Sequence, residues 1–470
     1  MFSHHASPEG FTKTSGLSTI PFWLDNPQRP VARAPLSGVE AADLLVIGGG
    51  FTGLWAALEA KIAYPDQRIV LVEGGRIAEG ASGRNGGFVS ASLTHGFSNG
   101  HSRWPNDMTE LHRLGVENLA AMQARVAEFA IDCDWLPSGE IDVAVADYQQ
   151  DQLRETHEQM RESGIESTLL DAAQVRQLVN SPIYRGGLVD PDVAMVDPAR
   201  LAWGLARAAE ELGVVIHEHS PVGSINDVGD HVEVSLAHGS IVAERVLLAT
   251  NAYPPLLRRI RHYVIPVYDY VLMTRPLTDP ELASIGWSGR EGISDSGNQF
   301  HYYRMSEDRR ILFGGYDAVY HRDNGMGTRF DQDAESFARL ADHFVATFPQ
   351  LSNISFTHAW GGAIDTCSRF SAFWGTAHGG KTAYVMGYTG LGVGASRFGA
   401  VTCLDLLYSR QTERTRLEMV RTKPLPFPPE PLRSEVIRWT TAAIKSADRK
   451  EGKRNLWLRL LDSLGLGFDS

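Results

Sequence analysis

The first strong hydrophobic pattern in the chain is a short apolar run over residues 44–47 that ends in three glycines. Residues 54–58 then place apolar side chains at helical spacing, and a second apolar run covers 68–73. This pattern predicts strand, tight turn, helix and strand, a unit of ~30 residues. Because such crossovers are right-handed, we expect the two strands to be parallel neighbours in one sheet.

Longer periodic stretches predict the helices around this unit. Residues 106–130 and 147–179 have helical periodicity and are expected in a second layer. Asp197 is a predicted N-cap, with Pro198 at the first position of a helix that extends to Leu212.

Strand-type runs follow that helix in two groups. The first group, which is expected to return the chain to the first sheet, covers residues 214–217, 232–236 and 245–249. The second group, over 263–274 and 300–313, is followed by a predicted helix over 331–348. We expect the second group to form a second domain.

The two ends of the chain lack this pattern. Residues 1–40 are proline-rich and aperiodic, which indicates an irregular arm on the domain surface. Residues 423–431 form a proline-rich linker to a C-terminal appendage, in which an apolar face (Trp457, Leu460, Leu461, Leu464) lies beside basic residues (Arg449, Lys450, Lys453, Arg454). Such an amphipathic helix either lies on a membrane or docks on its own domain or a partner subunit, and docking is the favoured interpretation.

Composition limits the function classes. The 44 Lys and Arg residues against 56 Asp and Glu give a net charge of −12, so nucleic acid is not an expected partner. The 3 cysteines are too few for a disulfide framework, no Cys/His spacing suits a metal, and no secretory signal or membrane span is recognisable. We therefore expect a cytoplasmic protein without a metal site. The 46 glycines in 470 residues exceed the typical ~7% and indicate backbone that needs positive φ or close approach.

Several of these glycines form the turn after the first strand, where Gly48–Gly53 has the sequence G-x-G-x-x-G. Such a turn lets backbone N–H groups and the helix N-terminus approach a pyrophosphate. Glu73 ends the second strand at the ~20-residue spacing at which an acid accepts the ribose hydroxyl, whereas an arginine would favour NADP. A lone motif can be a mere tight turn, but strand, helix and Glu73 in register favour dinucleotide binding. The fingerprint alone serves FAD and NAD equally.

Four further segments distinguish these cofactors. The stretch Ser82–Gly87, S-G-R-N-G-G, resembles the segment that passes beside the flavin in the D-amino-acid-oxidase (DAO) superfamily of FAD enzymes. Residues 246–253, 360–362 and 387–392 resemble that family's Ala-Thr-Asn-Ala turn, its tryptophan-glycine segment and its G-Y-x-G-x-G flavin loop. The resemblance spans about residues 41–407. Within the superfamily the chain is most similar to the gamma-glutamylputrescine oxidase-like amine oxidases.

The resemblance implies an α/β fold with a Rossmann-like FAD-binding domain of discontinuous segments and an antiparallel substrate domain with helices. The implied FAD-binding domain comprises residues 41–105, 190–260 and 355–410, and the substrate domain 106–189 and 261–354, with an arm over 1–40 and an appendage over 411–470. FAD is expected to bind non-covalently. The implied cofactor-binding residues are Gly48, Gly50, Phe51, Thr52, Gly53, Glu73, Gly74, Arg76, Ser82, Gly83, Arg84, Asn85, Gly86, Gly87, Val222, Thr250, Asn251, Gly362, Thr389, Gly390, Leu391 and Gly392.

The family's reaction is also implied. A C–H bond beside an amine nitrogen gives hydride to flavin N5, the imine hydrolyses to an aldehyde or keto product, and dioxygen reoxidises the flavin and yields hydrogen peroxide. The expected catalytic residues are Tyr302, His301, Trp360 and Tyr270, with Tyr268 and Tyr303 as further candidates for the lining. Each of them also suits a sheet core. Strand alternation excludes that Tyr302 and Tyr303 both face the flavin.

Departures from the family pattern bear on the substrate. Amino-acid-oxidising relatives have an arginine that clamps the substrate carboxylate where this chain has Ile364, and sarcosine-oxidase-like members have a lysine where it has Gly394. A small amine, of polyamine or gamma-glutamylated type, is therefore the expected substrate. Covalent flavin attachment through Cys367 is not expected, because this residue does not align cleanly with the cysteine of that branch.

Two charged positions have alternative interpretations. Asp365 either holds the cationic end of a substrate or pairs with Arg369, and Arg304 is a candidate for binding a distal carboxylate. Three other functions remain as alternatives to an oxidase with dioxygen as partner. They are a dehydrogenase or deaminase that passes electrons to a quinone or other acceptor, a non-catalytic flavin-binding protein, and an NAD(P)-linked dehydrogenase. The sequence leaves a homo-oligomer open.

Overall fold

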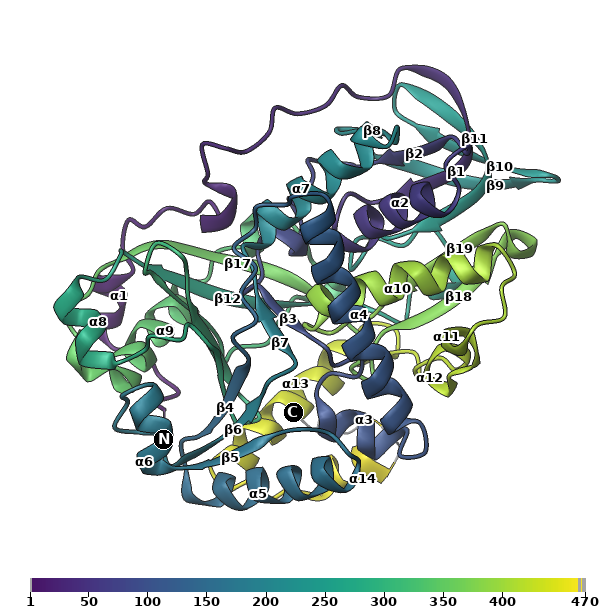
Figure 1. Ribbon diagram of the computed structural model, residues 1–470. Coiled ribbons are helices and arrows are strands. Elements are labelled where there is room, and N and C mark those ends of the chain that lie inside the picture. The colour runs from purple at the N-terminus through teal and green to yellow at the C-terminus, as the bar shows by residue number, and fades with distance from the viewer. Residues whose placement is uncertain (1, 464–465, 467–470) are drawn as a thin grey trace.

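The computed structural model describes residues 2–463 and 466, and it is built on two large sheets that lie side by side (Figure 1). The first is an eight-stranded sheet, and the second has nine strands. A third, two-stranded sheet pairs β3 (Phe88–Ser90) with β7 (Val193–Met195). The mixed α/β fold class expected from the sequence is confirmed.

The first sheet has a parallel centre. Along it the order is β18-β19-β11-β1-β2-β8, with β10 and β9 added at β11. Strand β1 is parallel to both β2 and β11, as the strand-helix-strand pattern predicts. The strands come from three separate parts of the chain: β1 (Gly38–Ile47), β2 (Ile69–Val72), β8 (Val215–His217), β9 (Val222–Val228), β10 (His231–Leu236), β11 (Gly239–Leu248), β18 (Phe373–Ala377) and β19 (Thr382–Met386).

Helices α2 (Phe51–Ala63), α7 (Pro198–Glu211), α10 (Gly392–Leu407) and α4 (Met108–Glu128) pack with this sheet. Asp197 caps α7 as predicted, because its side chain accepts from the backbone N–H of Arg200. Helix α4 was expected in the substrate domain, but its apolar stripe is buried in the same core as α2 and α10. Gly394 allows α10 to approach the backbone at Ser90, because a Cβ there would lie 2.0 Å from the Ser90 carbonyl oxygen. Asn118 of α4 donates to the Gly394 carbonyl at 2.9 Å.

The second sheet is mostly antiparallel. Its order is β16-β12-β15-β14-β13-β4-β6-β5, with β17 paired to β12, and helix α9 (Ala334–Thr347) packs on one face. Its strands are β4 (Glu140–Ala144), β5 (Thr168–Asp171), β6 (Gly186–Asp190), β12 (Ile265–Thr274), β13 (Gly292–Asp295), β14 (His301–Met305), β15 (Ile311–Gly315), β16 (Val319–Tyr320) and β17 (Phe356–Thr366).

Two boundaries differ from the sequence expectation, and one expected run divides. The strand-type run expected over 300–313 forms two strands, β14 and β15, which pair as a hairpin. The helix expected over 147–179 ends at Glu162, where Gly164 takes a left-handed φ of 74° and the chain continues into β5. Strand β17 lies in the second sheet because it pairs with β12 along its length, although residues 355–410 were expected in the FAD-binding domain.

The remaining helices are mostly peripheral. Their bounds are α1 (Pro8–Lys13), α3 (Phe97–Arg103), α5 (Asp147–Glu162), α6 (Ala172–Leu178), α8 (Asp279–Ile285), α11 (Glu413–Arg416), α12 (Glu418–Arg421), α13 (Leu432–Asp448) and α14 (Leu456–Ser463). Helices α11 and α12 pack beside α10 and β18 of the first sheet, whereas α13 lies near β4 and β6 of the second sheet (Figure 1). Helix α14 docks on α13, since Leu458 is buried there and the Trp457 indole donates to Thr440 Oγ1 at 3.0 Å. Leu464, assigned to the same apolar face, lies outside the described residues. None of the described helices is both long and apolar enough to cross a membrane.

Candidate active site

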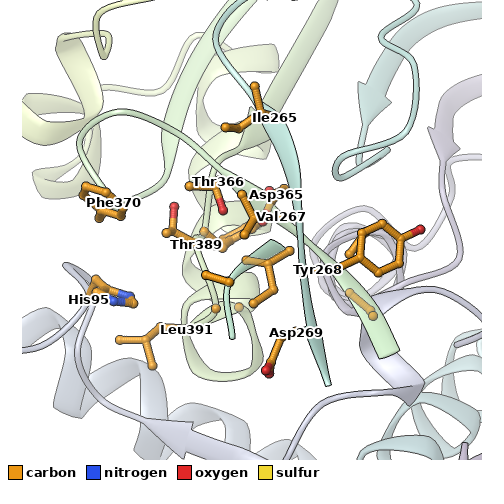
Figure 2. A pocket seen from close by; sticks show the side chains of 18 of the residues that line it. His95, Ile265, Val267, Tyr268, Asp269, Asp365, Thr366, Phe370, Thr389 and Leu391 are labelled. Carbon is orange, nitrogen blue, oxygen red and sulfur yellow. The ribbon is translucent and has the colours of Figure 1, made fainter. Parts of the chain in front are cut away.

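A cavity of about 720 Å³ runs from the β1–α2 turn, between the two sheets, to helix α13. Its walls come from segments far apart in sequence: the turn after β1, residues 81–88, strands β12, β14 and β17, the loop after β19, and α13. Figure 2 shows the side chains of β12 and β17 beside those of the loop after β19, with His95 and Tyr268 at opposite sides of the view. The volume falls in the range typical of cofactor and substrate pockets.

Glycine is required at the β1–α2 turn. Gly48 has a φ of 117°, and a Cβ on it would lie 2.3 Å from the Ala249 carbonyl oxygen. A Cβ on Gly53 would lie 1.8 Å from the Gly48 carbonyl oxygen. The turn therefore brings the N-terminus of α2, at Gly50, to the cavity wall, where the helix dipole favours an anion.

Glu73 supports this turn from the end of β2. Its two carboxylate oxygens accept hydrogen bonds from the backbone N–H groups of Gly49, at 2.6 Å, and Gly75, at 2.7 Å. Burial raises the pKa of Glu73, and these two hydrogen bonds oppose that shift. Glu73 therefore holds the turn that the sequence assigned to pyrophosphate binding.

The segment 82–87 joins the turn to the second sheet. Ser82 Oγ accepts from the Phe51 backbone N–H at 2.9 Å. Arg84 Nη1 donates to Asp331 Oδ2 at 2.8 Å and to the Gly361 carbonyl, at the start of the wall formed by β17, at 2.9 Å. The segment predicted to pass beside the flavin thus fixes the relative position of the two sheets at the cavity.

The loop after β19 closes the other side of the same region. The side chain of Asp365, on β17, accepts a hydrogen bond from the Gly387 backbone N–H at 2.6 Å. The backbone carbonyl of Asp365 accepts one from the Thr389 backbone N–H at 3.3 Å. The hydroxyl of Tyr388 shares a 2.9 Å hydrogen bond with Thr52 at the start of α2. Burial raises the pKa of Asp365 to about 7, against the effect of these backbone donors.

Most of the residues predicted to bind the cofactor lie around this region. Those that line the cavity are Gly50, Phe51, Thr52, Ser82, Arg84, Asn85, Gly86, Asn251, Gly362, Thr389, Gly390, Leu391 and Gly392. The others are not part of its described lining: Gly48, Gly53, Glu73, Gly74, Arg76, Gly83, Gly87, Val222 and Thr250. The glycines in the first group leave backbone open to the cavity, as an elongated cofactor with a pyrophosphate requires.

Of the four predicted catalytic residues, Tyr302 lines the cavity. Its hydroxyl donates to Asp269 Oδ2 on β12 at 2.5 Å. Tyr303, the next residue on β14, faces the opposite layer, where its hydroxyl shares a 2.7 Å hydrogen bond with that of Tyr184. The two tyrosines thus point to opposite faces, as strand alternation predicts.

The other three predicted catalytic side chains are fully buried away from the described cavity lining. His301 bonds to Asp295 and to His343, at 2.6 and 2.8 Å. The Trp360 indole donates to the Arg84 carbonyl at 2.9 Å, and Tyr270 donates to the Phe330 carbonyl at 3.1 Å. These side chains brace the walls of the cavity, and we do not keep them as catalytic candidates.

Asp269 was missed by the sequence analysis. It lies between Tyr268 and Tyr270, and its carboxylate accepts from Tyr302 and from its own neighbour's N–H. Burial raises the pKa of Asp269 to about 6, and these hydrogen bonds limit the rise. A charged residue inside the apolar run 263–274 was the signal that could have identified it. His95, also missed, lines the cavity with its pKa lowered to about 4 by burial.

The hypotheses for Arg304 and Arg369 are not supported by the geometry. Arg304 is fully buried and donates to the Val196 carbonyl at 2.5 Å, outside the described cavity lining. Arg369 donates to the Met419 carbonyl at 2.8 Å, and no ion pair joins it to Asp365 in the described part of the chain. Asp365 therefore lines the cavity, and its carboxylate holds the loop after β19 through the hydrogen bond from Gly387.

The surroundings of Ile364, Gly394 and Cys367, where the sequence departs from the family pattern, are defined in the structure. Ile364 lines the cavity, so an apolar side chain lies where relatives have their arginine. A Cβ on Gly394 would lie 2.0 Å from the Ser90 carbonyl oxygen, which leaves no room for a lysine. The buried Cys367 thiol donates to the Ser371 carbonyl, at a sulfur-to-oxygen distance of 3.1 Å.

A second carboxylate site lies on the far part of the same wall. Glu140, which lines the cavity, and Asp142, both on β4, share the hydroxyl of Ser294 on β13, which has one proton to donate and can accept from a protonated carboxyl. Withdrawal from water raises the pKa of both carboxyls, and repulsion from Asp142 raises that of Glu140 further. Near neutral pH, this pair of carboxyls therefore still binds a proton.

We expect Glu140→Gln to gain stability relative to the wild type as the pH rises from about 4.5 to about 8. In this window the folded wild type keeps the Glu140 proton while the unfolded chain releases it, so deprotonation favours unfolding. Glutamine has no proton to release. The difference should grow by at most about 1.4 kcal/mol per pH unit, measured by urea unfolding of the apoprotein.

Glu158→Gln, on the exposed side of α5, is the matched control and should show no such slope. A Glu140→Gln difference that is flat across the window would show that this carboxyl titrates as in the unfolded chain.

A parallel dinucleotide-type sheet, a glycine turn at a helix N-terminus and a second sheet over the same cavity define a flavin-binding oxidoreductase. The chain belongs to the family of FAD-dependent oxidoreductases named DAO, whose family model matches residues 43–403. FAD is the cofactor of this family, and the residues around the glycine turn fit it.

Individual relatives agree with this assignment. The chain is 32% identical to "Gamma-glutamylputrescine oxidoreductase" of Escherichia coli, over 78% of this chain and 83% of the relative. It is 30% identical to "Probable oxidoreductase OrdL" of Haemophilus influenzae, over 79% of this chain and 84% of the relative. The crystal structure of glycine oxidase from Geobacillus kaustophilus matches the fold with a TM-score of 0.69 at 19% identity, over 82% of this chain and 100% of that chain.

Proposed function

We propose that the protein oxidises the CH–NH bond of a small amine, with dioxygen as electron acceptor and with hydrogen peroxide and an aldehyde or keto compound as products. The observation that carries the proposal is the Asp269–Tyr302 pair, a carboxylate and its hydrogen-bonded tyrosine at the wall of an otherwise largely apolar cavity. A relative named for the oxidation of gamma-glutamylputrescine supports the same class of substrate.

The charges around the cavity favour a cationic ligand. Its lining includes the carboxylate of Asp269, whose pKa of about 6 leaves it ionised at pH 7. Of the other acidic residues in the lining, Asp317 is paired with Arg339, and burial raises the pKa of Glu140 to about 8 and that of Asp365 to about 7. The arginines in the described lining are Arg84 and Arg433, and hydrogen bonds to Asp331 and to Asn324, respectively, engage their guanidinium groups. An α-carboxylate therefore has no evident clamp here, in agreement with Ile364 at the family's arginine position.

Asp269 supplies a proton acceptor for this chemistry. An alkylammonium of pKa ~10.4 must lose its proton before its carbon can give up hydride, which costs about 4.6 kcal/mol at pH 7. A carboxylate with a pKa of about 6 is ionised at that pH and can accept this proton. Tyr302 orients the carboxylate by donating to Oδ2. FAD, when bound, accepts the hydride, and water then hydrolyses the imine.

The purified holoenzyme should lose its visible flavin absorbance when an amine substrate is added without oxygen, and should release peroxide when oxygen returns. The panel comprises primary amines, N-methylated amines, polyamines, their gamma-glutamyl conjugates and amino acids. We expect hits among amines and conjugates, because the cavity attracts cations and lacks a carboxylate clamp.

Two results would contradict parts of this proposal. Bleaching by amino acids alone would contradict the inference that Ile364, in place of the family's arginine, excludes substrates with an α-carboxylate. Bleaching by amines with a negligible yield of peroxide would assign a quinone or another electron acceptor in place of dioxygen.

A further inference from the structure

One wall of the cavity comes from outside the part of the chain that the family model matches. That match ends at residue 403, whereas helix α13 comprises Leu432–Asp448. Six residues of α13 line the cavity, and their spacing places them on one face of the helix: Arg433, Val436, Ile437, Thr440, Thr441 and Ile444. The common catalytic core of the family is thus extended here by an added wall.

Helix α13 is fixed to the cavity rim at its N-terminal end. Arg433 donates to Asn324 Oδ1 at 2.7 Å and bonds to His262 at 2.9 Å. Glu430, just before the helix, accepts from the hydroxyl of Tyr320 at 2.6 Å. Both Arg433 and Tyr320 also line the cavity, so the anchor is part of the wall.

The C-terminal end of α13 is anchored as well. Asp448 accepts from the backbone N–H and the side-chain amide of Asn298, at 3.2 and 2.6 Å, and from the backbone N–H of Gln299 at 3.0 Å. Asn298 and Gln299 precede β14, the strand that carries Tyr302. Helix α14 packs behind α13 through Leu458. The position of the wall relative to Tyr302 is therefore fixed at both ends.

We propose that α13 determines substrate length, by forming an apolar wall for the chain of an elongated aliphatic amine whose nitrogen lies at Asp269. This rests on the proposed function, because it takes Asp269 as the site of the amine. The side chains of Val436, Ile437 and Ile444 supply the apolar contact. Each buried methylene contributes about 0.8 kcal/mol, so a wall of this kind favours long amines over short ones.

The test fills the wall with one larger side chain. Thr441→Trp should weaken octylamine binding roughly ten-fold, and propylamine binding by less than about two-fold, because the proposal places only the longer chain against α13. Affinity is measured without oxygen, from the amine concentration at which the rate of flavin bleaching is half-maximal. The matched control is Ala442→Trp, which adds an even larger volume on the exposed side of the same helix and should leave both affinities unchanged.

Ile444→Ala keeps the test decisive if Thr441→Trp loses its flavin. It removes apolar contact, so it should lower the preference for octylamine several-fold. Equal effects on both amines, or equal effects of Thr441→Trp and Ala442→Trp, would overturn the role of α13. A wild-type enzyme whose flavin responds to no amine would overturn the proposed function, and the length selection with it.

Discussion

Replacing Gly53 with alanine is expected to yield protein that folds but retains almost no FAD. The added Cβ would lie 1.8 Å from the Gly48 carbonyl oxygen, a backbone atom that cannot rotate away. Gly48 itself is held by its φ of 117° and by the nearby Ala249 carbonyl. The collision must therefore shift the turn that presents the N-terminus of α2. Overpacking of this kind costs about 1–3 kcal/mol, which corresponds to roughly ten- to hundred-fold weaker binding.

The measurement is the ratio of visible flavin absorbance to protein absorbance after purification and after dialysis. Gly223→Ala is the matched control, because its Cβ would meet nothing closer than the Ser235 carbonyl oxygen at 3.7 Å. That variant, in β9 of the same sheet, should retain FAD as the wild type does. Full flavin occupancy in Gly53→Ala would show that the turn does not form the cofactor site.

The first sheet and its turn were predictable because their signals are local. A strand that ends in glycines, a helix, and Glu73 at the end of the next strand lie within one short stretch of sequence. Asp197 and Pro198 predicted the start of α7 for the same reason, since a cap contacts only its own first turn. Local patterns of this kind determine the elements and their order.

Side-chain roles around the cavity depend on partners far along the chain. Trp360 is turned away from the cavity by the Arg84 carbonyl, and His301 by its hydrogen bond to His343. Alternation on a strand shows that Tyr302 and Tyr303 face opposite sides, but not which side is the cavity. Helix α13 has no local signal for its place, because the residues that anchor it, such as Asn298, lie more than a hundred positions earlier.

Asp269→Asn is expected to lower the rate of flavin reduction at neutral pH by about 10²–10⁴-fold, the range for loss of a general base. Asparagine keeps the shape, and its one oxygen can still accept from Tyr302, whereas the Tyr270 N–H loses its side-chain acceptor. What is lost is the group that takes the ammonium proton. Stopped-flow reduction by an amine without oxygen measures the effect, and the flavin content of the variant checks its integrity.

The pH dependence separates this role from a structural one. In the wild type the rate should fall as the pH drops through about 6, because a protonated Asp269 cannot accept the proton. Asp269→Asn should lack this acid limb and recover rate as the pH approaches the amine pKa of ~10.4, where the substrate is already neutral. Tyr302→Phe removes a hydrogen bond that lowers the pKa of Asp269, so its acid limb should move to higher pH. If Asp269→Asn kept the wild-type acid limb, the proton acceptor would have to be another group, and Asp269 would only support the wall.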